Sequence, residues 1–316
     1  MTFSPAPVDV VAPATSANLG PGFDALGLAL ALHDHLTALV TTGGLHVEVE
    51  GIGAQALARD ETHLVVRSMR AAFDRLGVRP PGLRLHCRNT IPHGRGLGSS
   101  AAAIVSGIVA ARALVAGGDA ALSDGEALAL AASIEGHPDN VAACLLGGLA
   151  IAWTQDEKGR AIRRDTTVRT VLLVPEQPVP TEVARALLPP TVPHHAAAAT
   201  AGRAALLVAA MTAPEPSRDL LFAATQEWLH QEQRRSAMPA TWSLLEQLRA
   251  DALPAVVSGA GPSVLVLLPG GPDGAAVSQV RRRTPHGWSC HVLGVDPQGA
   301  RVVAGMTYGA PALAGT

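Results

Sequence analysis

Several short segments in the first half of the chain combine apolar and β-branched residues and end at glycine or polar turn residues, a pattern typical of strands. The pattern predicts strands at Val8–Ala12, Leu36–Thr41, His46–Glu50 and Leu83–Arg88. The pair Gly43-Gly44 separates the second of these strands from the third and predicts a turn there.

Helical spacing of apolar residues occurs between these strand-like segments. Thr62–Leu76 shows it and ends at Gly77, a suitable C-terminal cap. Ser99–Val115 is rich in alanine and long enough for a buried helix. Ser123 and Glu126 precede another apolar run and predict a capping box. The polar segment Trp153–Asp165 is rich in turn residues, and we expect a hairpin near a domain boundary.

The second half repeats the mixture of strands and helices. The predicted elements are a strand at Val168–Val174, several helices between Thr181 and Asp251, a strand–glycine turn–strand unit at Val256–Leu268, a helix at Gly274–Arg283 and a strand at Trp288–Val295. Strands flanked by helices in both halves indicate two α+β domains, which we place at residues 1–165 and 166–316. Strand order does not follow from this pattern.

Composition and charge exclude several classes of function. The chain of 316 residues carries 24 Lys+Arg against 26 Asp+Glu, so no basic excess indicates nucleic-acid binding. The longest uncharged stretch, Leu253–Pro272, is broken by prolines and glycines, which argues against a membrane-spanning helix. Three distant cysteines and the lack of a signal-peptide pattern favour the reducing cytoplasm.

The lysine content narrows the chemistry further. Lys158 is the only lysine, and it lies in a turn-like segment. Schiff-base chemistry and the phosphate-binding lysine of a P-loop would both depend on this one residue, so neither is expected.

The segment Pro92–Ala102, P-H-G-R-G-L-G-S-S-A-A, is the most informative part of the chain. Its alternate glycines allow a close approach of backbone to ligand, and its serines stand where a long helix begins. Exposed N–H groups at a helix N-terminus form a natural anion site. The segment lacks the G-K-[ST] ending of a Walker A loop, and a purely structural helix cap is the competing interpretation.

Three more segments combine polar groups with glycines. Pro13–Asp24 follows a strand, and we expect a loop there that wraps a polar ligand with Asn18 and Asp24. Glu135–Asn140 gathers two carboxylates, an imidazole and an amide, and Glu135 or Asp139 suits a hard cation such as Mg²⁺. Ser258–Ser263 joins two apolar strands. An ordinary turn is the competing structural interpretation for each segment.

The order of these segments resembles that of the GHMP kinases, the superfamily of galactokinase, homoserine kinase and mevalonate kinase. P-A-T-S-A-N-L-G-P-G-F-D at Pro13–Asp24, the glycine-rich segment at Pro92–Ala102 and S-G-A-G-P-S at Ser258–Ser263 are similar to its three signature motifs. The likeness spans about residues 8–295 and is greatest to the homoserine kinase family. It implies an N-terminal domain like ribosomal protein S5 domain 2 and a ferredoxin-like C-terminal domain, with ATP between them.

The resemblance also implies roles for individual residues. It implies that the phosphate loop binds ATP through Pro92, His93, Gly94, Arg95, Gly96, Leu97, Gly98, Ser99, Ser100, Ala101 and Ala102. Ser100 and Glu135 would hold Mg²⁺. The third motif contributes Ser258, Gly259, Ala260 and Gly261, and the homoserine site contributes Asn18, Asp24, Asn140, Thr181, Arg185 and Arg234. Glu135, Asp139 and Asn140 form the implied catalytic group.

The chemistry of L-homoserine matches this set, because the substrate presents a carboxylate, an ammonium group and a hydroxyl. Arg185 and Arg234 suit the carboxylate, and Asp24 suits the ammonium group. The family's tyrosine before Arg234 is Gln233 here, so Arg235 stays a second candidate for that role.

The sequence leaves the general base and the acceptor open. Asp139 is a candidate base for the hydroxyl proton, and His137 is interpreted as structural. The expected activity is ATP-dependent phosphorylation of L-homoserine for threonine biosynthesis. The competing hypotheses are another small-molecule GHMP kinase, of the mevalonate or 4-diphosphocytidyl-methylerythritol type, and a nucleotide-binding sensor without turnover. A homodimer is common in the family, although no feature of this sequence establishes one.

Overall fold

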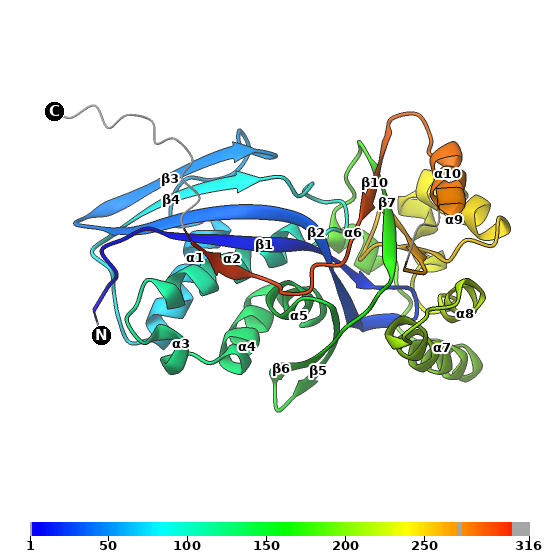
Figure 1. Cartoon of the computed structure of the whole chain (residues 1–316), viewed down its shortest axis with the longest axis horizontal. Helices are drawn as coiled ribbons and strands as arrows, with labels where there is room; N and C mark the ends of the chain where they lie inside the picture. Colours follow the sequence, from blue (N-terminus) through cyan, green and yellow to red (C-terminus); the bar gives the residue numbers. More distant parts are fainter. Residues whose placement is uncertain (1, 271–273, 305–316) are drawn as a thin grey trace.

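Two β-sheets with helices packed against them organise the chain in the computed structural model, which describes residues 2–270 and 274–304 (Figure 1). The strands are β1 (Val8–Asn18), β2 (Gly22–Thr41), β3 (Gly44–Gly51), β4 (Gly82–Asn89), β5 (Leu149–Gln155), β6 (Lys158–Arg164), β7 (Arg169–Pro175), β8 (Ala255–Val257), β9 (Val264–Leu268), β10 (Trp288–Leu293) and β11 (Arg301–Val303). The helices are α1 (Leu64–Arg75), α2 (Ser99–Ala113), α3 (Gly118–Ala121), α4 (Asp124–Glu135), α5 (Asp139–Leu146), α6 (Thr181–Ala186), α7 (His194–Thr212), α8 (Arg218–Ala224), the 3-10 helix η1 (Glu232–Ala237), α9 (Pro239–Ala250) and α10 (Gly274–Arg283).

The first sheet has seven strands, with the path β11-β1-β2-β4-β3 and with β5 and β6 attached to β2. Its pairs are antiparallel except β3 with β4, which run parallel. Helices α1, α2, α4 and α5 lie together on one side of this sheet (Figure 1). Helix α2 is buried along most of its length because alanine, valine and isoleucine occupy nearly every turn. Its burial holds the N-terminus of α2 in a fixed position below the sheet.

The second sheet has four antiparallel strands in the order β10-β7-β9-β8. Alternate residues of β7 point to opposite faces of this sheet. Val171 and Leu173 pack with residues of α9 and α10, whereas Leu172 and Val174 belong to the core that also includes residues of α7 and α8. Helices therefore cover both faces of the second sheet, and one of its cores is continuous with the core of the first.

The strand and helix segments expected from the sequence are present, including the hairpin β5–β6 and the capping box at Ser123. The expectation of a loop at Pro13–Asp24 is wrong. Strand β1 continues to Asn18 and β2 already begins at Gly22, so the motif forms a strand, a three-residue turn and a strand. Asn18 and Leu19 have φ angles of 68° and 49°, and this left-handed backbone makes the turn tight.

The division into domains at residues 165 and 166 stays a prediction. The division falls between β6 and β7, which lie in different sheets, but β11 returns to pair with β1 in the first sheet. The sequence pattern did not predict β11. Residues 305–316 of the second predicted domain lie outside the described residues.

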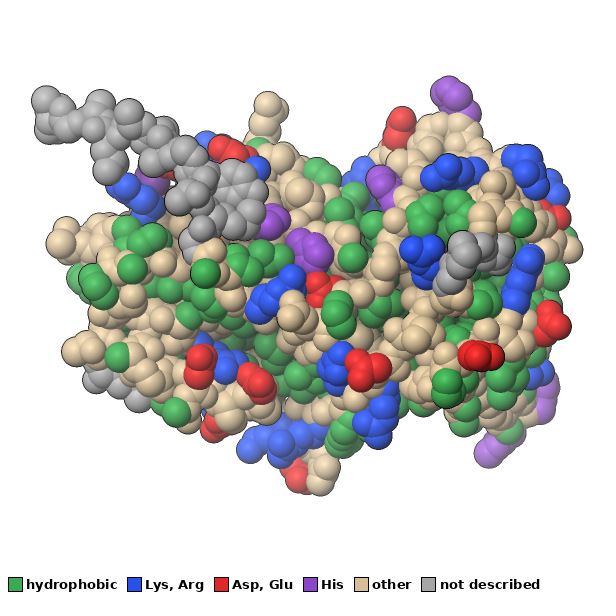
Figure 2. Space-filling model, in the orientation of Figure 1, with side chains coloured by type: hydrophobic (Ala, Val, Ile, Leu, Met, Phe, Trp, Pro, Cys, Tyr) green, Lys and Arg blue, Asp and Glu red, His purple; other side chains and the backbone are tan. Residues whose placement is uncertain are grey.

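Charged side chains of both signs are interspersed on the surface shown in Figure 2, where Lys and Arg lie beside Asp and Glu in several small groups. Within residues 2–270 and 274–304, every helix is too short or too polar to cross a membrane.

Candidate active site

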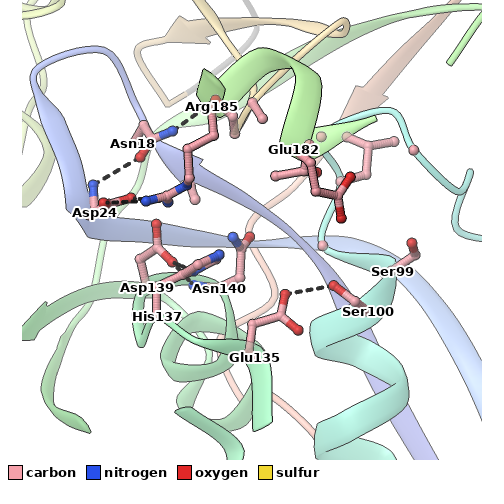
Figure 3. Close-up of a pocket in the computed structure, with 18 of the residues that line it drawn as sticks. Asn18, Asp24, Ser99, Ser100, Glu135, His137, Asp139, Asn140, Glu182 and Arg185 are labelled. Atoms are coloured by element: carbon pink, nitrogen blue, oxygen red, sulfur yellow. Dashed lines mark hydrogen bonds and ion pairs between the residues drawn. The ribbon is translucent and has the colours of Figure 1, made fainter. Parts of the chain in front are cut away.

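The three glycine-containing motifs meet at one cavity of about 390 Å³, although the first and the third are more than 200 residues apart in the chain. Helix α6, the segment between α4 and α5, and one residue of η1 complete its walls (Figure 3). The lining residues are Ala17, Asn18, Asp24, Gly94, Gly96, Leu97, Gly98, Ser99, Ser100, Glu135, His137, Asp139, Asn140, Thr181, Glu182, Arg185, Arg234, Gly259 and Ala260. We call this cavity the main pocket.

The glycine loop enters the main pocket directly before α2. Gly96 and Gly98 have φ angles of 70° and 65°, which favour glycine. Neighbouring atoms also exclude a side chain, because an added Cβ would lie 2.1 Å from the Ser258 carbonyl oxygen at Gly96 and 1.9 Å from Thr15 Oγ1 at Gly98. The backbone N–H groups at the start of the 15-residue helix α2 are therefore held beside the pocket, where they favour an anion.

The third motif supports this loop from the opposite side. The Ser258 hydroxyl lies 2.7 Å from the carbonyl oxygen of Gly96 and 2.8 Å from Ser16 Oγ. Gly259 and Ala260 line the pocket, while Ser258 and Gly261 lie behind it. The serine of the third motif thus connects the first and second motifs.

Glu135 and Ser100 face each other at one end of the pocket, where α4 ends and α2 begins (Figure 3). The Ser100 hydroxyl donates a hydrogen bond of 2.6 Å to Glu135 Oε1. Burial raises the pKa of Glu135, and the hydrogen bond from Ser100 partly offsets that rise. A half-buried carboxylate beside a hydroxyl is a suitable oxygen pair for a hard cation, whose charge would offset the cost of partly burying the carboxylate.

The pair alone is an incomplete metal site. Among residues 2–270 and 274–304, no three His, Cys, Asp or Glu side chains are grouped closely enough to hold a metal. Mg²⁺ commonly takes one or two protein oxygens and completes its shell with phosphates and water. The donor set therefore fits Mg²⁺ that arrives with a nucleotide.

Asp139 and its neighbours form the floor of the pocket. Asp139 is 1% exposed, and its Oδ1 accepts hydrogen bonds from the Asn140 backbone N–H at 2.8 Å and from His137 Nδ1 at 2.6 Å. This bond to Asp139 raises the pKa of His137, against the opposing effect of burial. Thr15 Oγ1 donates to Asn140 Oδ1 at 2.7 Å, which leaves the Asn140 amide NH₂ as its group for a ligand.

Asn18 holds the first motif in place through both ends of its amide. Its Nδ2 donates to the Gly259 carbonyl oxygen at 2.8 Å, and its Oδ1 accepts from the backbone N–H of Asp24 at 3.0 Å. Asp24 has a φ angle of 53°, so the hydrogen bond from its N–H helps to hold an uncommon backbone conformation. Asn18 therefore fixes the position of the Asp24 carboxylate.

Asp24 and Arg185 form a two-bond ion pair across the opposite end of the pocket (Figure 3). Arg185 Nη2 lies 2.8 Å from Asp24 Oδ1, and Nη1 lies 3.2 Å from Oδ2. Both side chains are partly exposed, at 35% for Asp24 and 45% for Arg185. An ion pair in such contact with water contributes little to stability, so a ligand can separate it at low cost.

Arg234 is the buried cation of the same end, with 1% exposure. His230 Nε2 donates to the Gly20 carbonyl oxygen at 2.7 Å, and its Nδ1 therefore accepts from Arg234 Nη1 at 3.0 Å. Burial lowers the pKa of Arg234, and the positive charge of Arg185 lowers it further. Within the described residues the Nε of Arg234 is buried without a hydrogen-bond partner, and the residue lines the pocket, where its positive charge favours an anion.

The structure separates the two arginines that the sequence left as candidates for one role. Arg234 lines the pocket, whereas the Arg235 side chain is 63% exposed and lies near Glu232. The sequence missed three supporting residues. His230 orients Arg234, Phe23 stacks on His230 with ring centroids 5.0 Å apart, and Glu182 lines the pocket from α6. Phe23 lies within the first motif, which assigned it no role, and no motif marks His230 or Glu182.

Several residues of the predicted ATP loop lie elsewhere. Pro92, Arg95, Ala101 and Ala102 are absent from the pocket lining. The Arg95 guanidinium instead donates to the carbonyl oxygens of His93, Pro175 and Glu176. The sequence offered no signal for this direction, because the side chain of a loop residue between glycines can point to either side.

His93 lines a second, mostly apolar cavity of about 260 Å³. This second cavity shares Ser99 and Ser100 with the main pocket, so the two are neighbours at the start of α2. Burial raises the pKa of Asp34 in its wall to about 6. His63 Nδ1, in the same wall, is buried and has no hydrogen-bond partner in the part of the chain that the structure describes. The second cavity can take a flat apolar group with a polar edge.

Known proteins resemble this chain in sequence over most of its length. The GHMP kinases N terminal domain model matches residues 63–148, and the GHMP kinases C terminal model matches residues 203–286. A homoserine kinase of Streptomyces avermitilis is 54% identical over 304 residues, covering 95% of this chain and 97% of its own. A homoserine kinase of Leifsonia xyli is 50% identical over 304 residues, covering 93% of this chain and 91% of its own.

A solved structure shares the fold of this chain. The crystal structure of homoserine kinase from Cytophaga hutchinsonii matches with a TM-score of 0.81 and 24% sequence identity. The match covers 96% of this chain and 99% of that one. At 24% sequence identity, this match supports a shared fold alone.

Proposed function

This chain belongs to the GHMP kinase family, and we propose that it transfers the γ-phosphoryl group of ATP to the hydroxyl of L-homoserine, giving O-phospho-L-homoserine. The predicted resemblance and the predicted two-domain GHMP kinase fold of mixed helix and sheet are both confirmed. The main pocket carries the proposal, because it joins a glycine loop and a carboxylate–hydroxyl pair at one end to two arginines and an aspartate at the other. The product would serve threonine biosynthesis.

The glycine loop and α2 support the placing of ATP. Backbone N–H groups of residues 96–100 would hold the phosphates, because the N-terminus of a long buried helix favours the binding of an anion. The adjoining second cavity would take the base, since it is apolar and meets the main pocket at Ser99 and Ser100. A nucleotide can therefore span both cavities.

Ser100 and Glu135 would hold Mg²⁺ together with the phosphates. When bound, Mg²⁺ would neutralise the charge that develops on the phosphate oxygens during transfer. The single lysine of the chain is absent from the lining of the main pocket. Helix N–H groups and the metal would therefore supply the positive potential that a P-loop lysine supplies elsewhere.

The arginine end supports an amino-acid substrate. The Arg234 guanidinium, which lines the pocket, would donate to the substrate carboxylate, and Arg185 would bind the same carboxylate once it has left Asp24. The substrate ammonium group would then take the place of Arg185 beside Asp24. Binding is thus an exchange of ion pairs, in which each charge of homoserine replaces a charge of the protein.

The hydroxyl of homoserine would lie over Asn140, between the two ends. Its oxygen forms the new bond to the γ-phosphorus, the bond to the leaving ADP oxygen breaks, and the hydroxyl proton is released. The base role of Asp139 stays a prediction. Its Oδ1 already accepts two hydrogen bonds, which favours a role in orienting His137. Phosphoryl transfer through a loose transition state needs little help from a base.

A coupled assay of ADP release tests the proposed function. Purified protein is supplied with ATP, Mg²⁺ and, in turn, homoserine, mevalonate, galactose and 4-diphosphocytidyl-methylerythritol. We expect turnover with homoserine and formation of its phosphate ester. Turnover with another acceptor alone would identify a different GHMP kinase, and ATP binding without transfer to any acceptor would identify a sensor. The homodimer and the cytoplasmic location stay predictions.

A further inference from the structure

Helix α6 supplies Thr181, Glu182 and Arg185 to the main pocket, but its own packing fixes it weakly. The helix has six residues, and Ala184 is its single buried residue. Val183 is 51% exposed, and Leu187, the residue directly after the helix, is 38% exposed, which shows how little of this segment enters the core. A helix this short and this exposed depends on contacts outside itself for its position.

Helix α6 contacts η1, and the segment that leads into α6 supplies further contacts. It runs from Pro175, the last residue of β7, to Pro180, the residue before α6. Prolines at 175, 178 and 180 restrict the φ angles of the segment, which reduces the freedom of its two ends to move independently. Whatever holds the start of this segment therefore helps to set the position of Arg185, together with the ion pair between Arg185 and Asp24.

Arg95 of the glycine loop holds that start. Its guanidinium donates to the Glu176 carbonyl oxygen, to the Pro175 carbonyl oxygen at 3.5 Å and, within its own loop, to the His93 carbonyl oxygen at 2.6 Å. The backbone N–H of Val179 returns a bond of 3.0 Å to the Gly94 carbonyl oxygen. The planar five-donor group of arginine can bridge such a set of carbonyls, whereas a lysine ammonium cannot reach the same fork.

We propose that Arg95 is a positioning residue, which joins the phosphate loop to the segment before α6 and so sets the place of Arg185 in the homoserine half of the pocket. The proposal rests on the proposed function for the identity of the substrate. In this proposal Arg95 affects the binding of the amino-acid substrate and makes no direct contact with ATP. If Arg95 instead bound a phosphate of ATP directly, its loss would weaken the binding of ATP.

The kinetic test compares Arg95→Ala and Arg95→Lys with the parent protein and with Arg84→Ala, an exposed arginine on β4 that serves as the matched control. We expect both Arg95 variants to raise the homoserine KM about tenfold and to change the ATP KM less than about twofold. Added guanidinium ion should lower the homoserine KM of Arg95→Ala. A rise confined to the ATP KM, rescued by lysine, would overturn the proposal.

A second readout needs no substrate. Hydrogen–deuterium exchange of peptides covering residues 176–188 should be faster in Arg95→Lys than in the parent protein, with unchanged exchange in α2. If Arg95→Ala fails to fold, Pro178→Gly loosens the same segment and should raise the homoserine KM alone. Unchanged exchange in Arg95→Lys would refute the positioning role. Absence of homoserine turnover in the parent protein would instead refute the proposed function and leave the exchange result to decide the positioning role.

Discussion

The two ends of the main pocket differ in how their charges are arranged before a ligand arrives. At the Glu135 end a carboxylate faces a hydroxyl beside the N-terminus of α2, and partial burial raises the pKa of that carboxylate. At the Arg185 end an ion pair already joins Asp24 to Arg185, and Arg234 lies buried behind it. The first end therefore needs a cation to be completed, whereas the second needs a substrate that can replace an existing pair.

This difference suggests a division of work. The cation-poor end suits ATP with Mg²⁺, because both supply what its groups lack. The paired end suits a zwitterion, because a ligand with only one charge would leave Asp24 or Arg185 without a partner. Variants at each end should then affect different kinetic constants.

The largest expected effect is at the Glu135 end. Glu135→Gln keeps the shape but removes the charge, so kcat should fall about 10²–10³-fold while the homoserine KM changes little. Steady-state kinetics over a range of Mg²⁺ concentrations measures both constants. Glu246→Gln, an exposed position on α9, is the control. Equal kcat values for Glu135→Gln and the parent protein would rule out the metal role.

Substitutions at the arginine end should change the homoserine KM more than kcat. Arg234→Ala removes a buried donor to the carboxylate, and we expect the homoserine KM to rise about 10–100-fold with a smaller change in the ATP KM. The adjacent Arg235→Ala is a matched control, since its side chain is 63% exposed. If Arg235→Ala raised the homoserine KM and Arg234→Ala did not, the assignment of the buried arginine would be wrong.

The ion-pair exchange can be tested with a substrate that lacks one charge. Asp24→Asn should lower the preference for homoserine over 4-hydroxybutyrate about tenfold, because the ammonium group loses its partner while the carboxylate does not. The ratio of kcat/KM values for the two compounds measures the effect. Asp74→Asn, exposed on α1, is the control. An unchanged ratio would place the ammonium group elsewhere.

The smallest effect concerns stability at the floor of the pocket between the two ends. The hydrogen bond to Asp139 raises the pKa of His137 above its ordinary value. The stabilisation by this bond is therefore full below pH 6.5 and is lost as the pH rises through the raised pKa. His137→Gln should lower the thermal midpoint by about 2–4 °C more at pH 6 than at pH 9. A difference independent of pH would contradict the role of this bond.

The sequence predicted the residues of both ends but not their arrangement. Motif order identified the glycine loop, Glu135 and the family, because these need glycine conformations and oxygen ligands that local residue types reveal. The choice between Arg234 and Arg235 required burial, which depends on η1 packing against Phe23 and His230.

Long-range contacts explain the remaining differences. The predicted loop at Pro13–Asp24 is two strands and a turn, because pairing with β2 extends β1 as far as Asn18. Arg95 points to Glu176, about 80 residues away, and no local pattern contains that information. Strand β11 forms by pairing with β1 at the other end of the chain.

A crystal structure with homoserine, Mg²⁺ and a non-hydrolysable ATP analogue tests the division of the pocket most directly. We predict Mg²⁺ on Ser100 and Glu135, the substrate carboxylate on Arg234 and Arg185, and the ammonium group on Asp24 in place of Arg185. Homoserine bound with the Asp24–Arg185 pair intact, or with its carboxylate at the Glu135 end, would contradict this prediction.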